Sequence, residues 1–283
     1  MTIAQFQKNI LDWYRNPPAG GAMRSRMPWR RTRDPYKILV SEVMLQQTQI
    51  ARVLPKYKEF LGAFPDLASL AAATDKRLLK VWAGLGYWRR AKYLKKTAQL
   101  ITNNYNGKFP KDPKILETFP GIGPYTARAL ACFAFGSREA FLDTNIRRVY
   151  LHFFFPRRKN VSDKEILRVA QRAIDTLPKN VSSREWHYAL FDYGATVLKD
   201  KQINRRSRHY HKQSKFEGSF RSFRTAVVQY LLSQPQNRTP QKKVRHVLEE
   251  LLKKEKTPYS AQEILDSLLK DRLIKKSRTH YYL

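Results

Sequence analysis

The sequence predicts an all-α protein with two or three small domains. Apolar residues recur at helical spacing in one segment after another, and short turns containing Pro or Gly separate these segments. No strand-like alternation of apolar and polar residues stands out before residue 270. The chain has 283 residues, of which 42% are hydrophobic, and this is enough to build more than one core.

The helices follow from these signals in order. Residues 3–14 place apolar side chains on one helical face. Asp34-Pro35 is a helix-start signal, and we expect the helix that it opens to run through Ile50. A further helix is expected to begin at Asp143. The remaining helices of the body are expected at 53–60, 67–72, 75–82, 91–104, 113–119, 125–135, 162–176 and 185–198.

The C-terminal part differs in composition. Residues 199–224 are polar and basic with almost no aliphatic side chains, so this segment is expected to cross the surface between domains. Three helices at 223–233, 240–253 and 260–272, followed by a hairpin over 273–283, fit a winged-helix module. That fold serves DNA binding and protein contacts about equally, and its role here stays open.

The charge balance points to a polyanionic partner. The formal net charge is +32, and such an excess repels itself unless a polyanion compensates it, so nucleic acid is the first partner to consider. The five Trp and 15 Tyr argue against a ribosome-like coating protein. One cysteine, Cys132, rules out an internal disulfide and suits a reducing compartment. With no signal segment or long apolar run, we expect a monomeric protein of the cytoplasm and nucleoid that does not contact membranes.

A glycine turn supplies a candidate phosphate site. Gly121 and Gly123 flank one aliphatic residue between two predicted helices, which allows a tight reversal with outward N–H groups. The N-terminal end of the following helix lies at the same place, so the turn can hold a nucleic-acid phosphate. Pro-Gly-x-Gly turns are also common in proteins of other kinds.

Two carboxylates are candidates for chemistry. Glu42 lies within a largely apolar run, where burial should raise its pKa and make it either a structural acid or a proton donor. Asp143 heads a helix beside Asn145, and an aspartate there is more often a cap than a catalyst. A phosphate grip followed by one acid suggests an enzyme that works on a nucleic-acid sugar.

The loop 84–90, GLGYWRR, combines a flexible turn with aromatic and arginine residues. Tyr87 could stack on a base while Arg89 and Arg90 grip phosphates. An ordinary helix-joining turn with exposed arginines is an equally good interpretation. His209 and His211 lack a cysteine or acid at ligand spacing, so no metal site is expected.

Residues 28–220 resemble the helix-hairpin-helix DNA glycosylases, and most closely the MutY-type adenine DNA glycosylases. The resemblance rests on the motifs PWR at 28–30, DPY at 34–36, SEVMLQQTQ at 41–49, GLGYWRRA at 84–91, FPGIGPYTA at 119–127, LDTNIRRV at 142–149 and FDYGA at 191–195. It implies a two-lobed fold and the excision of adenine paired with 8-oxoguanine or guanine in double-stranded DNA, with the base flipped out of the helix.

The resemblance also implies residue roles. Glu42 would protonate the adenine and then activate water, and Asp143 would stabilise the cationic sugar. Tyr125 and Asn145 match positions that orient these acids. Gln47 and Tyr87 match residues that wedge into the duplex. The pocket around the flipped base would be formed by Trp29, Arg30, Ile50 and Asp192.

Two substitutions bear on the reaction type. In relatives that also cut the strand, the residue after the hairpin is a lysine that forms a Schiff base, and here it is Tyr125. A monofunctional glycosylase is therefore expected. Arg147 stands where some adenine glycosylases carry a lysine capable of an incidental adduct, and arginine should form none.

The chain departs from the family in two places. The positions of the four cysteines that bind an iron–sulfur cluster hold Leu198, Arg205, Arg208 and Ser214, so we expect no cluster and no other cofactor. The basic loop 201–224, with Arg205, Arg206 and Arg208, is expected to bind DNA in its place. A short winged-helix-like tail also stands where long members carry a nudix-like domain that recognises 8-oxoguanine.

The expected domains are 28–133, a six-helix barrel-type domain with the hairpin; 1–27 with 134–220, a helical domain that holds Asp143 and the basic loop; and 221–283, the winged-helix-like domain. Two alternatives stay open: a mismatch thymine or uracil glycosylase of the same superfamily, and a non-catalytic DNA-binding protein on this scaffold. Because binding alone needs neither carboxylate, the presence of both Glu42 and Asp143 argues against the second alternative.

Overall fold

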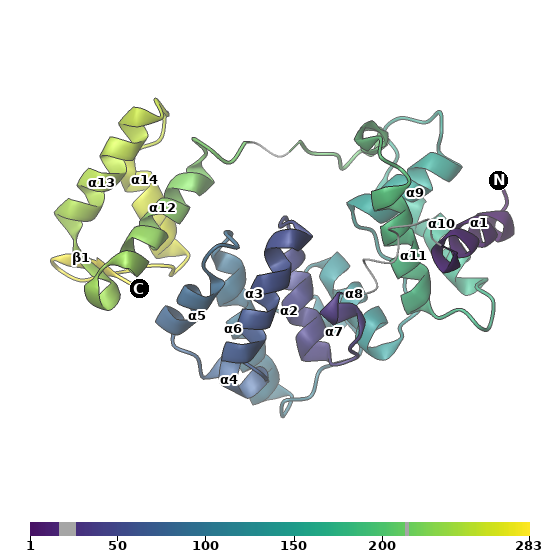
Figure 1. The fold of residues 1–283 in the computed structure, drawn as a ribbon, viewed down its shortest axis with the longest axis horizontal. Coiled ribbons are helices and arrows are strands. Elements are labelled where there is room, and N and C mark those ends of the chain that lie inside the picture. Colours follow the sequence, from purple (N-terminus) through teal and green to yellow (C-terminus); the bar gives the residue numbers. More distant parts are fainter. Residues whose placement is uncertain (17–26, 213–214) are drawn as a thin grey trace. The chain divides into compact units, whose positions relative to one another are not determined.

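The computed structural model describes residues 1–16, 27–212 and 215–283 (Figure 1). The chain divides into two compact units, each made of two segments: Met1–Glu42 with Phe109–Lys212, and Val43–Lys108 with Gln213–Leu283. The three-domain boundaries expected from the sequence stay a prediction. In the described part of the chain, no helix has the length and apolar character needed to cross a membrane.

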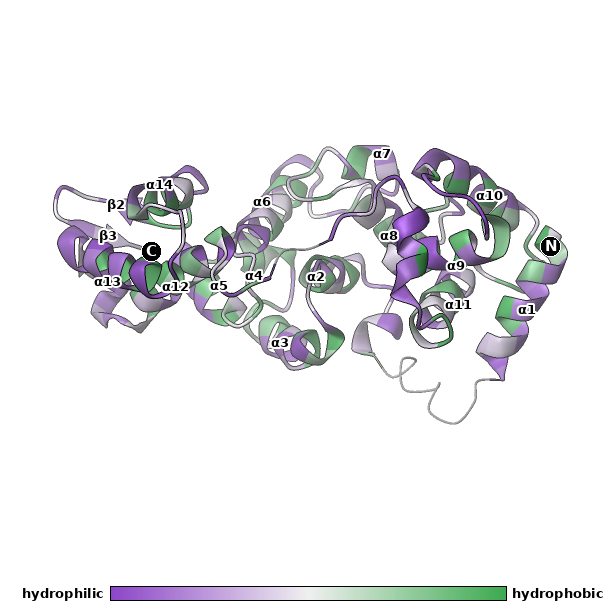
Figure 2. Ribbon diagram, turned by 90° about the horizontal axis from the view of Figure 1, so that it is seen from above, coloured by the Kyte–Doolittle hydropathy of each residue, from purple (hydrophilic) through white to green (hydrophobic). Residues whose placement is uncertain are grey.

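The first unit is all-helical, as predicted. Its elements are α1 (Ile3–Arg15), η2 (Pro28–Arg30), most of α2 (Pro35–Leu45), α7 (Pro113–Leu116), α8 (Pro124–Phe135), α9 (Thr144–Phe154), α10 (Asp163–Asp175), α11 (Ser183–Thr196) and η3 (Lys201–Arg206). Hydrophobic and hydrophilic residues alternate around α1, as the amphipathic pattern predicted (Figure 2). Its buried Phe6 packs against Tyr150 of α9 and Trp186 of α11, with ring centroids 5.3 and 5.5 Å away, so these helices share one aromatic core.

Helices α9 and α11 approach each other unusually closely. A Cβ atom on Gly194 of α11 would lie 2.4 Å from the carbonyl oxygen of Asn145 in α9. The buried Arg148 of α9 donates hydrogen bonds to the carbonyl oxygens of Gly194 (2.7 Å) and Leu198 (3.2 Å) at the end of α11. Glycine is therefore required here by the space available and not by its backbone angles.

The first part of the basic segment 199–224 folds onto the first unit, contrary to the expectation of a surface crossing. Helix η3 packs on α9 and buries Ile203 and Asn204. The chain then pairs with Val161, whose N–H donates to the Arg206 carbonyl and whose carbonyl accepts from the Arg208 N–H, both at 2.9 Å. Two buried side chains and the backbone pairing with Val161 thus anchor a loop whose composition predicted a fully solvated segment. Ser214, aligned with the fourth cluster cysteine, lies outside the described residues.

The second unit holds the other helices and a small sheet. Its helices are α3 (Ile50–Ala63), α4 (Leu67–Ala71), α5 (Asp75–Trp82), α6 (Arg89–Asn104), α12 (Phe220–Ser233), η4 (Pro235–Asn237), α13 (Gln241–Lys254) and α14 (Ala261–Lys270). Helix α6 packs on α4 and α5, and α3 packs on α5. The buried Phe60 of α3 and Trp82 of α5 form the aromatic part of this core, with ring centroids 5.8 Å apart.

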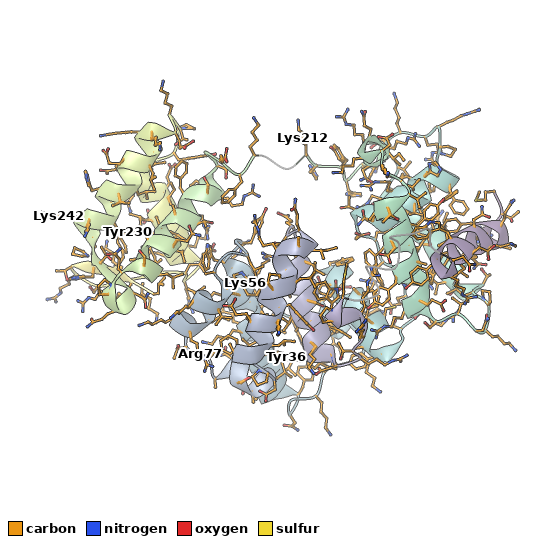
Figure 3. The ribbon with its side chains drawn as sticks, in the orientation of Figure 1. Tyr36, Lys56, Arg77, Lys212, Tyr230 and Lys242 are labelled. Carbon is orange, nitrogen blue, oxygen red and sulfur yellow. The ribbon has the colours of Figure 1, made fainter. Side chains whose placement is uncertain are left out.

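The C-terminal residues form the winged-helix topology that the sequence predicted. Helices α12, α13 and α14 pack on one another, and Tyr230 and Lys242 mark α12 and α13 in Figure 3. Strands β1 (Arg238–Pro240), β2 (Lys275–Lys276) and β3 (His280–Tyr282) form an antiparallel sheet in the order β1-β3-β2. The sequence predicted only the β2–β3 hairpin. Strand β1 was missed because three residues ending in proline carry no alternation.

Helices α2 and α7 end clearly earlier than expected. Helix α2 ends at Leu45 instead of Ile50, and a turn closed by the Thr48 N–H on the Leu45 carbonyl (3.3 Å) separates it from α3. Gln47 in that turn has a left-handed backbone with φ of 54°. Helix α7 ends at Leu116 instead of residue 119. In both places a run of good helix formers continues past the point where tertiary contacts stop the helix.

Candidate active site

Glu42 is a buried acid near the end of α2. Its neighbours Ile38, Leu39 and Val43 are buried, and Glu42 itself is 6% exposed. Tyr36, labelled in Figure 3, lies near the start of the same helix and is also buried. The pKa of Glu42 is raised to about 7, chiefly by burial and also by the charge of Asp143, while the Tyr125 hydrogen bond and the charge of Arg30 oppose the rise. The pKa rise expected from the apolar sequence context is confirmed. Close to neutral pH this carboxyl can therefore both hold and release a proton.

Tyr125 connects the hairpin to this acid. It lies in the first turn of α8, and its Oη donates a hydrogen bond of 2.9 Å to Glu42 Oε2. Its ring packs edge-on against Phe141, with centroids 5.7 Å apart. Burial, together with the charges of Glu42 and Asp143, raises the pKa of Tyr125 well above its ordinary value. Tyr125 therefore stays protonated and acts as a donor to Glu42.

Asp143 is the N-cap of α9, the role that an aspartate before a helix most often has. Its Oδ1 accepts from the Ile146 N–H (2.6 Å), and its Oδ2 accepts from Asn145 Nδ2 (3.1 Å). Burial raises the pKa of Asp143, and these hydrogen bonds from α9 oppose the rise. The carboxylate is thus held in a fixed orientation, and its charge is felt at Glu42. Capping a helix and presenting a charge are compatible roles for one carboxylate.

Arg30 and Asp192 form a buried ion pair in the same unit. Arg30 Nη1 and Nη2 donate to the two Asp192 oxygens at 2.7 and 2.9 Å, and the side chains are 9% and 5% exposed. The Arg30 guanidinium also lies over the Tyr188 ring, 4.4 Å from its centroid. Trp29, beside Arg30 in η2, is buried. Arg30 of η2 and Asp192 of α11, two of the predicted pocket residues, are therefore brought together.

Tyr188 is a member of this group that sequence reasoning missed. It lies one helical turn before Asp192 on α11, so the two side chains share a face. The i, i+4 spacing of Tyr188 and Asp192 was the available signal, because it places the ring on the same helix face as the carboxylate that binds Arg30.

The glycine turn has the geometry expected of a hairpin between two helices. Gly121 has φ of 75°, a conformation that favours glycine, and Gly123 is the N-cap of α8, with Pro124 at the first helical position. Both glycines are exposed while Ile122 between them is buried. The turn is thus pinned by one apolar side chain and presents its backbone, with the N-terminal end of α8, to solvent.

The predicted wedge residues lie in two loops of the second unit. Gln47 is exposed, and Tyr87 is half-buried with φ of 48°. Tyr87 also accepts a hydrogen bond from Arg221 of α12. Ile50, predicted to line the base pocket, begins α3 and is half-buried in this unit.

The two adjacent arginines of the loop 84–90 have different surroundings. Arg89 is exposed, and it stays accessible to solvent although its Nη1 lies 3.4 Å from Asp271 Oδ1. Arg90 is 8% exposed and donates to backbone carbonyls. The expectation that Arg90 binds a phosphate is therefore wrong, because its guanidinium is buried and hydrogen-bonded to backbone carbonyls.

The arginines of the basic loop 201–224 lie on and after η3. Arg205 and Arg208 are exposed, with hydrogen bonds to Gln202 Oε1 (3.4 Å) and Asn160 Oδ1 (3.3 Å), and Arg206 is half-buried. In the described residues, no group of three or more His, Cys, Asp or Glu side chains is arranged to hold a metal ion.

A comparison with protein families matches residues 40–175 to the HhH-GPD superfamily base excision DNA repair protein family. The chain is similar to the adenine DNA glycosylase of Buchnera aphidicola subsp. Baizongia pistaciae, with 34% identity over 197 residues, covering 70% of this chain and 54% of that protein. It is 38% identical over 190 residues to the adenine DNA glycosylase of Mycobacterium tuberculosis, covering 67% and 60%. The chain thus spans between half and two thirds of the length of these bacterial relatives.

Solved structures with the same fold include a thermostable thymine-DNA glycosylase, with a TM-score of 0.60 and 26% identity, covering 70% of this chain and 88% of that chain. A non-covalent endonuclease III–DNA complex matches with a TM-score of 0.56 and 22% identity, covering 71% and 89%. These likenesses agree with the all-α architecture described above.

Proposed function

We propose that this chain, whose residues 40–175 match the HhH-GPD superfamily of base excision DNA repair proteins, is a monofunctional DNA glycosylase that releases adenine mispaired with 8-oxoguanine or guanine. The observation that carries the proposal is the hydrogen bond from Tyr125 to Glu42, a buried acid whose pKa lies at about 7. A scaffold that only binds DNA has no need of such an acid.

In the proposed reaction, Glu42 gives its proton to a ring nitrogen of the flipped adenine. The bond between the sugar C1′ and the base nitrogen breaks, and its electron pair leaves with the adenine. Protonating the base makes it a better leaving group, in the way that a raised-pKa carboxyl assists other glycosidic cleavages. Burial keeps enough of Glu42 protonated near neutral pH for this step.

Asp143 opposes the positive charge that then develops on the sugar. Its two oxygens are already oriented by the Ile146 N–H and by Asn145, so little reorganisation is needed when the charge appears. The ionised Glu42 can next take a proton from the water that adds to C1′, which restores the acid and leaves an abasic sugar. The two carboxyls have different roles because their surroundings give them different proton affinities.

The product is expected to be an intact strand with an abasic site. Tyr125 stands where a strand-cleaving relative would carry a lysine, and a phenol cannot form a Schiff base with the opened sugar. Arg147 is held by Asp163 through two hydrogen bonds of 2.8 Å. Neither side chain offers an amine for a covalent adduct.

One assay tests the substrate class. Purified protein would be incubated with duplexes that contain A:8-oxoguanine, A:G, T:G or U:G, and alkali would then convert abasic sites to strand breaks. We expect breaks at adenine, only after alkali, and no complex trapped by borohydride. Release of thymine or uracil without adenine would instead support the alternative of a mismatch thymine or uracil glycosylase, which the structural likeness to a thymine-DNA glycosylase keeps open.

A further inference from the structure

Arg90 is a buried cation whose hydrogen bonds all go to uncharged oxygen atoms. Arg90 lies in the first turn of α6, and its positive charge is buried in the second unit among backbone carbonyls. Burial lowers the pKa of Arg90 to about 10. Among the described contacts of this side chain there is no carboxylate partner. A buried guanidinium without a counter-ion is costly, so its contacts call for an explanation.

The guanidinium bridges two separate loops. Nη1 lies within hydrogen-bond distance of oxygens at the end of α2, and Nη2 reaches both the turn after α2 and the loop before α6. The acceptors are the carbonyls of Val43 (2.9 Å), Met44 (2.9 Å) and Gln46 (2.5 Å) for Nη1, and Thr48 Oγ1 (3.0 Å) and the carbonyls of Leu85 (3.1 Å) and Gly86 (3.2 Å) for Nη2. One planar fork thus fixes the spacing of two chain segments about forty residues apart.

Two of these acceptors each belong to the residue just before one with a left-handed backbone. The Gln46 carbonyl immediately precedes Gln47, and the Gly86 carbonyl immediately precedes Tyr87. Gln47 and Tyr87 both have left-handed backbones, with φ of 54° and 48°, a conformation that costs energy for residues with a side chain. The guanidinium also lies against the Tyr87 ring, 5.1 Å from its centroid. Arg90 therefore contacts the residue before Gln47 in one loop, and both Tyr87 and the residue before it in the other.

We propose that Arg90 is a positioning residue that holds Gln47 and Tyr87 together as a preformed two-point wedge for opening the DNA duplex. The inference rests on the proposed function, which supplies the wedge role of these two residues. Its structural part is independent of that role, since it concerns which group fixes the two left-handed loop tips. A rigid wedge enters a duplex without having to order its loops at the moment of binding.

The test uses Arg90→Lys, which keeps the charge but cannot span six acceptors, and Arg89→Lys as the matched control on the exposed neighbour. The first measurement is the fluorescence of 2-aminopurine placed next to the target adenine, at saturating protein. The second is the single-turnover rate of adenine release from a mispaired duplex and from a duplex in which the same adenine is already unstacked, opposite an abasic analogue.

We expect Arg90→Lys to lose most of the fluorescence increase and roughly tenfold to a hundredfold in rate on the mispaired duplex, the scale of a misplaced group. The loss should shrink on the unstacked adenine, because opening has already been supplied. Arg89→Lys should change binding to every duplex alike and leave the ratio of the two rates unaltered. Thr48→Ala, which removes one acceptor, should shift the same ratio by a smaller amount and carries the test if Arg90→Lys does not fold.

Equal losses on both duplexes, or an unchanged fluorescence increase, would overturn the inference and make Arg90 a merely structural cation. If the wild type releases adenine from neither duplex, the proposed function fails. The fluorescence of the wild type and of Arg90→Lys, which requires only DNA binding, still decides whether Arg90 supports the wedge.

Discussion

At the scale of single residues, the candidate site depends on how burial and hydrogen bonds oppose each other at Glu42. Burial in the apolar run of α2 raises the pKa of this carboxyl to about 7, although the Tyr125 hydroxyl, by hydrogen-bonding the ionised form, pulls it down. The same side chain can therefore serve as acid in one step and as base in the next. Asp143, held by α9, supplies charge to the site.

This balance makes a signed prediction about pH. Release of adenine by the wild type should be fastest below pH 7 and should fall by roughly tenfold per pH unit above it, because only protonated Glu42 can donate. Tyr125→Phe removes a hydrogen bond that lowers the pKa of Glu42, so the falling limb should move to higher pH. Single-turnover rates measured at pH values between roughly 5.5 and 9 would give the midpoint of the falling limb for the wild type and for Tyr125→Phe.

Asn145→Ala is the matched control, since Asn145 contacts Asp143 and not Glu42. It should lower the rate while leaving the midpoint in place. A midpoint for Tyr125→Phe at or below that of the wild type would contradict the assignment of Glu42 as the titrating acid.

Sequence reasoning predicted the burial of Glu42 but could not tell adjacent arginines apart. Glu42 could be predicted to be buried because its neighbours along α2 are apolar. Arg89 and Arg90 look equivalent as neighbouring basic residues, yet one is exposed and the other is buried among carbonyls. Which of the two turns inward depends on where α2 ends, and that is set by contacts between segments distant in sequence.

At the scale of secondary structure, the close approach of α11 to α9 bears on the position of Asp143, which caps α9 and is the proposed sugar-stabilising carboxylate. Gly194→Ala would force a Cβ to within 2.4 Å of the Asn145 carbonyl, so the helices must separate. We expect a loss of stability of roughly 1–3 kcal/mol, as for other overpacked interiors. Adenine release should also fall, because Asp143 and Asn145 belong to the displaced helix. Thermal unfolding and single-turnover kinetics would measure the two effects.

Gly62→Ala is the control for glycine replacement within a helix. Nothing lies within 4 Å of the Cβ that it would add, and alanine is the better helix former. It should leave stability unchanged or raise it by up to roughly 1 kcal/mol. If Gly194→Ala behaves like Gly62→Ala, then α9 and α11 are not in rigid contact at this point.

The basic loop after α11 gives a prediction at the same scale. Replacing Arg205, Arg206 and Arg208 together with Gln should weaken binding to all duplexes alike. It should also flatten the salt dependence of binding, by roughly 0.9 in logarithmic slope for each DNA phosphate that the variant no longer neutralises. Binding isotherms at several salt concentrations would measure the slope. An unaltered slope would mean that η3 and the residues after it do not touch DNA.

The helices themselves were largely predictable, and their ends were not. Apolar periodicity and capping residues predicted α1, α5 and α10 to within a residue or two. The end of α2 was predicted five residues too late. The Arg90 side chain binds the carbonyls at this helix end, and a contact between segments so distant in sequence leaves no local signal. Strand β1 was missed because its only signal is pairing with β3.

At the scale of the whole molecule, the single cysteine leads to a prediction about cofactors, and the net charge of +32 leads to one about DNA binding. One thiol cannot supply the ligand set of an iron–sulfur cluster, so the purified protein should be colourless, free of iron and still able to bind duplex DNA. Metal analysis and a visible absorption spectrum would check this. A brown protein that loses DNA binding on iron removal would contradict it.

The central claim is that Glu42 donates the proton that releases adenine, and Glu42→Gln tests it most directly. Glutamine keeps the size and the hydrogen-bonding capacity of the side chain but has no proton to give. The measurement is the single-turnover rate of adenine release from an A:8-oxoguanine duplex, with duplex affinity measured on the same preparation. The account predicts a rate lower by at least ~10²-fold with affinity retained, which is the scale of general acid catalysis. Release of adenine by Glu42→Gln at the wild-type rate would contradict it.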